Sequence, residues 1–139
     1  MMQNLSKKHT GFTLVELLVV IAIIGLLSTI VLVSFGPVRN QARDTAIKAN
    51  MSQMRLAAEI KYINDATYVT TTTRSDFVAA KAAATAAGGT SYAENWAAGT
   101  YCFQFALPGG GSWCIDSTGY IGSANITCNG TVPTRCASV

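Results

Sequence analysis

The chain opens with a short polar stretch, residues 1–11, and continues with a long apolar segment, residues 12–35. Glu16 is the one charged residue in that segment. A helix of about 20 apolar residues crosses the hydrocarbon core of a bilayer, whereas the apolar core of a signal peptide is about 7–15 residues long. No small-residue cleavage site follows the segment, because Gly36 and Pro37 come next. We therefore predict a membrane-crossing helix that the protein keeps.

Helical periodicity continues beyond the apolar segment. One face carries apolar residues at spacings of four, three, four and four: Ile47, Met51, Met54, Ala58 and Tyr62. This is the pattern of an amphipathic helix. It predicts one helix over residues 12–63, whose second half needs a domain to pack on.

Three positions are expected to weaken this helix. Gly25 lies in the middle of the apolar segment, and Gly36 and Pro37 follow its end. Proline removes a backbone hydrogen bond and clashes with the preceding turn, and kinks are found at such positions. We expect the helix to loosen at one of these positions.

The remainder of the chain changes character. Residues 64–100 form a predicted connecting region with a short helix at about 76–87, capped by Ser75 and ended by Gly88 and Gly89. Residues 101–139 are expected to form the sheet and a C-terminal tail, with strands at 101–107, 112–116 and about 119–122. The predicted class is α+β, a long N-terminal helix packed on a small antiparallel sheet.

Composition and charge support this organisation. Half of the residues are apolar and 12% are charged, against about 25% charged in a typical soluble domain. Ten basic and seven acidic residues give a net charge of +3, too little to predict direct nucleic-acid binding. Lys7 and Lys8 precede the apolar segment. The positive-inside rule therefore predicts a cytoplasmic N-terminus and an external C-terminal domain.

Four cysteines lie in the C-terminal region, namely Cys102, Cys114, Cys128 and Cys136. An even number in an extracellular domain indicates disulfides, and four cysteines allow three pairings. Short loops favour Cys102–Cys114 with Cys128–Cys136. A simple hairpin would not place the first two opposite each other, so the pairing stays open. Zinc is disfavoured, because the spacings are wrong and His9 is the one histidine.

No catalytic arrangement is found in the sequence. His9 lies in the polar stretch before the apolar segment, so no Ser-His-Asp or Cys-His site is expected in the domain. The glycines at 109–111 lack the lysine and helix of a phosphate-binding loop. Asp116 is interpreted as an Asx-turn residue rather than a calcium ligand. We predict a protein that is not an enzyme, with no cofactor and no bound metal.

The residues Gly11-Phe12-Thr13-Leu14-Val15-Glu16, followed by the apolar run, resemble the N-terminus of type IV pilins and pseudopilins. The resemblance implies that a prepilin peptidase removes the leader 1–11 by cutting between Gly11 and Phe12, and that Phe12 is then N-methylated. It also implies that Glu16 pairs with the Phe12 ammonium of a neighbouring subunit. A second interpretation places Glu16 at the cytoplasmic interface, where a charge is tolerated.

The function expected from this resemblance is that of a structural subunit of a type IV pilus. The precursor would cross the inner membrane once, and an assembly platform and ATPase would move it into an extracellular homopolymer. The filament would serve adhesion, twitching motility or DNA uptake. Two alternatives are a pseudopilin of a type II secretion system and a membrane-anchored extracellular binding domain that never polymerises.

Overall fold

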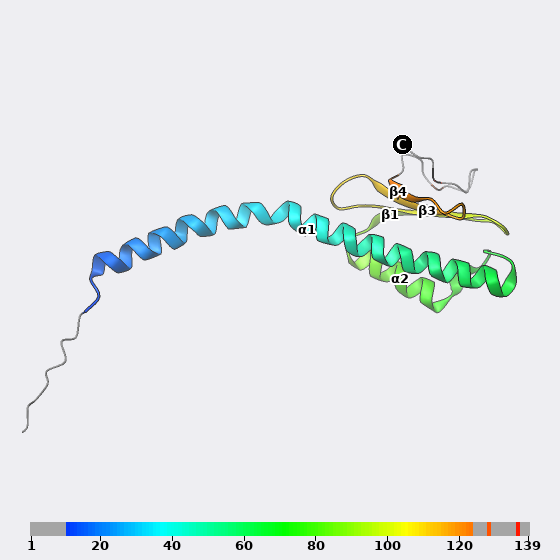
Figure 1. The fold of residues 1–139 in the computed structure, drawn as a ribbon, viewed down its shortest axis with the longest axis horizontal. Coiled ribbons are helices and arrows are strands. Elements are labelled where there is room, and N and C mark those ends of the chain that lie inside the picture. The colour runs from blue at the N-terminus through cyan, green and yellow to red at the C-terminus, as the bar shows by residue number, and fades with distance from the viewer. Residues whose placement is uncertain (1–10, 124–127, 129–135, 137–139) are drawn as a thin grey trace, which may run out of the picture. The chain divides into compact units, whose positions relative to one another are not determined.

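The computed structural model describes residues 11–123, Cys128 and Cys136, and Figure 1 shows their fold. The elements in chain order are α1 (Leu14–Asp65), the 3₁₀ turn η1 (Thr71–Thr73), α2 (Ser75–Ala86), β1 (Thr90–Trp96), β2 (Tyr101–Ala106), β3 (Ser112–Asp116) and β4 (Ile121–Ser123). The chain forms two units that divide between Gly36 and Pro37. This is the predicted α+β class, with a long helix followed by an antiparallel sheet.

Helix α1 is 52 residues long and contains Pro37 within it. It is helical at Gly25, Gly36 and Pro37, so the single chain has no break at the three positions where weakening was expected. A β-carbon added at Gly25 or Gly36 would meet nothing within 4 Å. Packing inside this chain therefore does not require glycine at either position. Loosening of the helix during assembly remains a prediction.

The second unit, residues 37–139, packs the amphipathic half of α1 and helix α2 against one face of the sheet. Ile47, Met51, Met54 and Ala58 are fully buried, as the spacing predicted. Tyr62, the last residue of that series, is 40% exposed. Its ring stacks on Tyr68 with the centroids 4.5 Å apart.

Helix α2 contributes the rest of the helical side of the core through Phe77, Ala80 and Ala84. Ser75 is the first helical residue rather than the N-cap, so the predicted cap was wrong; Arg74 occupies that position without a side-chain cap bond. The predicted end at the two glycines is confirmed. Gly88 has a φ of +108° and donates to the Thr85 carbonyl, while Gly89 donates to the Ala84 carbonyl. These two bonds form a Schellman cap, which favours glycine at the left-handed residue.

The sheet is an antiparallel meander in the order β1-β2-β3-β4. Its first strand was not predicted, because residues 90–96 were assigned to the connecting region. On the face toward the helices, Tyr101, Phe103, Phe105 and Ile115 are buried. The rings of Phe77 and Phe103 meet edge to face at a centroid distance of 6.1 Å. Aromatic side chains thus supply most of the apolar volume that the sheet brings to the core.

Replacing a fully buried side chain of α1 should destabilise the second unit. We expect Met54→Ala to lower the free energy of unfolding by about 2–5 kcal/mol, because it removes buried apolar atoms and leaves a cavity. Leu56→Ala is the matched control on the same helix, since Leu56 is 54% exposed. It should change stability by about 0.5 kcal/mol or less. Chemical denaturation of the full chain in detergent, followed by near-UV circular dichroism, measures both. Equal losses would contradict this core.

Candidate assembly and tail-anchoring sites

The start of α1 is held by a reciprocal pair of side chains, Thr13 and Glu16. The Thr13 backbone N–H and hydroxyl both donate to Glu16 Oε2, each at 2.8 Å. In return, the Glu16 backbone N–H donates to Thr13 Oγ1 at 3.2 Å. This is a capping box, in which two otherwise unsatisfied backbone donors of the first turn gain acceptors. Glu16 is therefore part of the helix start, a role that the sequence analysis did not assign.

Only one oxygen of the Glu16 carboxylate takes part in this cap. Oε2 accepts both bonds from Thr13, and Oε1 accepts none from the residues that the structure describes. Phe12 precedes the helix and is 81% exposed. Gly11 and Phe12 therefore directly precede the capping box, and the Glu16 carboxylate has an oxygen open to a further donor.

The first half of α1 exposes apolar side chains around its whole circumference. Residues Leu14–Val31 have a mean hydropathy of 2.8, and by length and composition this helix is able to cross a membrane. The hydroxyls of Ser28 and Thr29 are satisfied within the helix. Ser28 donates to the Ile24 carbonyl and Thr29 to the Leu26 carbonyl. A helix that is apolar on all sides needs lipid or other helices around it.

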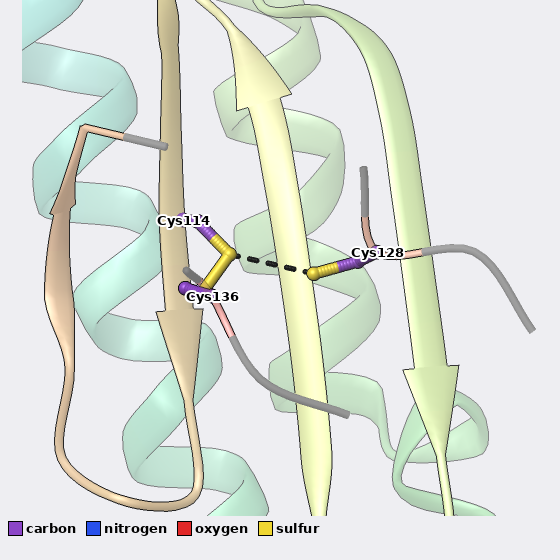
Figure 2. A group of neighbouring side chains, drawn as sticks. All are labelled: Cys114, Cys128 and Cys136. Atoms are coloured by element: carbon purple, nitrogen blue, oxygen red, sulfur yellow. Dashed lines mark hydrogen bonds between the residues drawn. A yellow bond between two sulfur atoms is a disulfide. The ribbon is translucent and has the colours of Figure 1, made fainter. Parts of the chain in front are cut away.

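Two disulfides anchor the C-terminal tail to the outer face of the sheet. They join Cys102 to Cys128 and Cys114 to Cys136, each with a Cα–Cα distance of 5.9 Å. The favoured pairing of Cys102 with Cys114 and of Cys128 with Cys136 was therefore wrong. Figure 2 shows Cys114 bonded to Cys136, with Cys128 beside them at 3.4 Å from the Cys114 sulfur.

The strand register explains this outcome. Cys102 lies opposite Asp116, and Gln104 lies opposite Cys114. The two strand cysteines therefore share one face but occupy diagonal positions. Each strand cysteine therefore forms its disulfide with a residue that lies over this face of the sheet. Both tail cysteines approach in this way, so each disulfide connects the sheet to the tail rather than two strands.

Two buried polar side chains of the sheet bind the backbone of the tail at the same points. Gln104 Oε1 accepts from the Cys128 N–H at 3.3 Å, and Asp116 Oδ2 accepts from the Cys136 N–H at 2.8 Å. Asp116 is 1% exposed and Gln104 is 7% exposed. Buried polar atoms need such partners, because an unsatisfied one costs about 1–3 kcal/mol. Each disulfide is thus accompanied by a hydrogen bond from the backbone N–H of its tail cysteine to a side chain two residues along the same strand.

Asp116 also forms the Asx-turn that the sequence predicted. Its Oδ1 accepts from the Thr118 N–H at 2.8 Å, the Thr118 hydroxyl at 2.6 Å and the Tyr120 N–H at 3.3 Å. Both carboxylate oxygens are therefore occupied by protein donors. The carboxylate serves the turn and the tail, and a cation would have to displace these bonds.

A group of three cysteine sulfurs lies close enough together to resemble a metal site. The sulfurs of Cys114, Cys128 and Cys136 lie within 4.8 Å of one another. Metal binding by cysteine requires thiolates, whereas each of these sulfurs belongs to a disulfide. The cluster is explained by the two neighbouring disulfides.

The distal end of α1 is tied to the sheet by Glu59. Its two carboxylate oxygens accept from the Tyr101 hydroxyl at 2.9 Å and the Tyr68 hydroxyl at 3.0 Å. Burial is the largest cause that raises the pKa of Tyr68, to about 12, and the bond to Glu59 adds to it. Burial raises the pKa of Tyr101 for the same reasons. Both hydroxyls thus remain neutral donors at ordinary pH, which keeps the helix docked on the sheet.

Comparisons with known proteins agree with this architecture. The family model described as "Prokaryotic N-terminal methylation motif" matches residues 6–32. The chain is 30% identical over 103 residues to the "Type IV wide pilus major component PilA4" of Thermus thermophilus, which covers 74% of this chain and 77% of that protein. It is 39% identical over 61 residues to a "Probable minor fimbrial protein" of Dichelobacter nodosus, covering 44% of this chain and 38% of that protein. No solved structure gives a significant match.

The long apolar helix, the small sheet and the methylation motif define a pilus-subunit class of protein. The extent of the match to the Thermus protein shows the family: the chain belongs to the type IV pilins. It is a structural subunit of a pilus and not an enzyme. Members of this family are anchored in a membrane as precursors and assemble with other pilins into filaments.

The disulfide pairing can be checked directly by peptide mapping. Trypsin cleaves after Arg135 and chymotrypsin after Trp113 and Tyr120. These three cuts separate all four cysteines. Non-reducing mass spectrometry should then recover two linked pairs, Cys102 with Cys128 and Cys114 with Cys136. A linked pair that joins Cys102 to Cys114 would contradict the structure.

Proposed function

We propose that the chain is made as a membrane-anchored precursor whose leader, residues 1–11, is removed by a prepilin peptidase. The cut falls between Gly11 and Phe12, and the new N-terminus is methylated at Phe12. The match of the methylation motif to residues 6–32 supports this step. The mature chain keeps its apolar helix, residues 12–35, and enters a filament through it. The observation that carries this proposal is the apolar surface that α1 exposes on all sides.

Transfer of this surface from the membrane to a filament explains why assembly needs a machine. In water, burial of each large apolar side chain against neighbours contributes about 1.5–3 kcal/mol. Many such residues of α1 are exposed in the single chain, so their summed contribution stabilises a polymer. In the membrane, however, lipid already covers the same side chains. An inner-membrane platform and an ATPase are therefore the proposed partners that drive extraction.

Glu16 is proposed to fix the register between neighbouring subunits of the filament. A carboxylate inside a membrane costs about 2.5–3.5 kcal/mol by insertion scales. The cap from Thr13 offsets part of this cost through Oε2. Oε1 is the oxygen proposed to accept the Phe12 ammonium of the neighbouring subunit. A buried ion pair adds little net stability, and the role proposed for this one is to fix the register between subunits. Subunits lacking the pair would dock out of register.

The proposed product is an extracellular pilus made of many copies of this chain. Its role is adhesion, twitching motility or DNA uptake. The mature chain has eight basic and seven acidic residues, because Lys7 and Lys8 leave with the leader, and its net side-chain charge is +1. Such a balance gives little attraction for nucleic acid. Direct nucleic-acid binding by this subunit is therefore not proposed.

Protein sheared from the cell surface tests the proposal. We expect an intact mass that starts at methylated Phe12. Each disulfide removes two hydrogens, so two bonds make the chain four hydrogens lighter than the reduced form. Gly11→Val should block the cut and keep the protein in the membrane with its leader. A wild-type chain that keeps residue 1 and never leaves the membrane would contradict the proposal. A processed chain that cannot be sheared off would favour a type II secretion pseudopilin.

Substitutions at Glu16 separate its charge from its role as a cap. Gln at this position retains an acceptor for the Thr13 donors, because glutamine also completes a capping box. Glu16→Gln should nevertheless abolish filaments, since a neutral amide cannot pair with an ammonium. Thr13→Ala is the control, which removes the cap, worth about 1 kcal/mol, but keeps the charge. It should only reduce the yield. The measurement is the ratio of filament protein sheared from the cells to precursor that remains in the membrane. Wild-type yield from Glu16→Gln would refute the charge pairing.

A further inference from the structure

Two arginines at the start of the second unit form no ion pair with any described residue. Arg39 and Arg43 are exposed and lie four residues apart, on the same side of α1. No ion pair joins either of them to any residue in the described part of the chain. The three ion pairs found there all lie in the later part of the unit, between Lys61 and Glu94. The two guanidinium groups are therefore available for an external anion.

The other charges beside them are already engaged. Asp44 accepts the Gly109 N–H at 3.0 Å. The Lys48 ammonium lies over the Trp113 ring, 4.2 Å from its centroid. Arg43 Cδ lies 3.7 Å from the place where a β-carbon on Gly88 would stand. The stem of Arg43 thus rests against the end of α2, while its charged group pairs with no acidic side chain among residues 11–123.

The two arginines follow closely on the apolar segment. Arg39 is eight residues after Val31, the end of the most hydropathic window, and four residues after Phe35. Four helical residues advance the chain by about 6 Å. A bilayer adds about 5–8 Å of headgroup layer on each side of its hydrocarbon core. Arg43 is a further four residues, about 6 Å, along the helix. Side chains on a helix point back toward its N-terminus, which brings the long guanidinium side chains of both residues toward this layer.

The location of Arg39 and Arg43 relative to the apolar segment favours an anionic partner. Basic residues near a span favour the cytoplasmic side, but here they follow the span on the side of the disulfide-bonded domain. On the side of the domain, Arg39 and Arg43 are the basic residues nearest to the apolar segment, whether or not the leader is present. An anionic group that neutralises them would offset this unfavourable placement.

We propose that Arg39 and Arg43 bind the phosphate of an anionic phospholipid headgroup while the subunit resides in the membrane. Arginine suits this role, because its planar group binds phosphate oxygens in a bidentate manner. The interaction holds the domain against the membrane surface before assembly and is lost when the subunit is extracted. It rests on the membrane-anchored precursor but not on the leader cut or on Glu16.

Native mass spectrometry of the full chain in detergent tests this binding. Phosphatidylglycerol and phosphatidylcholine with the same acyl chains are offered together, and the bound lipids are counted. The wild type should prefer phosphatidylglycerol. Each basic residue near an anionic surface changes the affinity by about fivefold, so Arg39→Gln with Arg43→Gln should lower the preference by up to about 25-fold at low salt. The preference should also weaken as salt rises.

A charge-matched double variant serves as the control. Lys61→Gln with Arg74→Gln removes the same net charge, but these side chains form ion pairs with Asp65 and Asp76. This variant should keep the lipid preference. Three outcomes would overturn the proposal: no preference in the wild type, equal loss in both double variants, or displacement of the lipid by inorganic phosphate. Retention of both lipids by every variant, without selectivity, would leave the membrane anchor intact and refute the headgroup site alone.

Discussion

The exposed apolar surface of α1 is the constraint on which the rest of the molecule depends. Side chains such as Leu14, Val19 and Leu26 are between about half and four-fifths exposed, and no second element of the described chain covers them. A helix of this kind is stable only inside a bilayer or among copies of itself. The single chain is therefore an incomplete structure. The membrane and the filament are two environments that can each cover the same apolar residues of α1.

The second half of the same helix has the opposite property, because its apolar face is buried within the chain. Met51 and Met54 lie in the core with the aromatic residues of the sheet, and Glu59 accepts hydrogen bonds from two tyrosines. One continuous helix thus belongs to an intermolecular core at one end and an intramolecular core at the other. The division at Gly36–Pro37 falls where these two roles meet.

The sequence predicted the parts of the fold that depend on local periodicity. Four of the five residues proposed for the buried face of α1 are fully buried, and the strands at 101–106 and 112–116 have nearly the expected limits. Strand β1 was missed, because its inward residues include Glu94. That carboxylate is accommodated by bonds from Tyr92 and Trp96 within the same strand, which an alternation of apolar and polar residues does not reveal.

The helix cap at Glu16 and the tail-anchoring disulfides could be predicted from the sequence only in part, like the fold. The errors have physical causes. The capping box was readable from Thr13 and Glu16, since threonine followed by glutamate three residues later is its signature. The disulfide pairing was not readable. It depends on the register that places Cys102 opposite Asp116 and on the path of the tail. Loop length favoured the wrong pairing because short loops are more frequently closed, whereas here the sheet geometry leaves both strand cysteines facing outward.

This outward arrangement also explains why the second face of the sheet binds Cys128 and Cys136. One face packs on two helices, but the other carries Gln104 and Asp116, whose polar atoms need partners away from water. A tail rich in glycine, asparagine and threonine has little apolar surface with which to bind there. Covalent links replace the missing hydrophobic contribution, and the two backbone bonds satisfy the buried oxygens. The attachment then depends on an oxidising environment rather than on apolar burial, which is the condition outside the cell where a pilus exists.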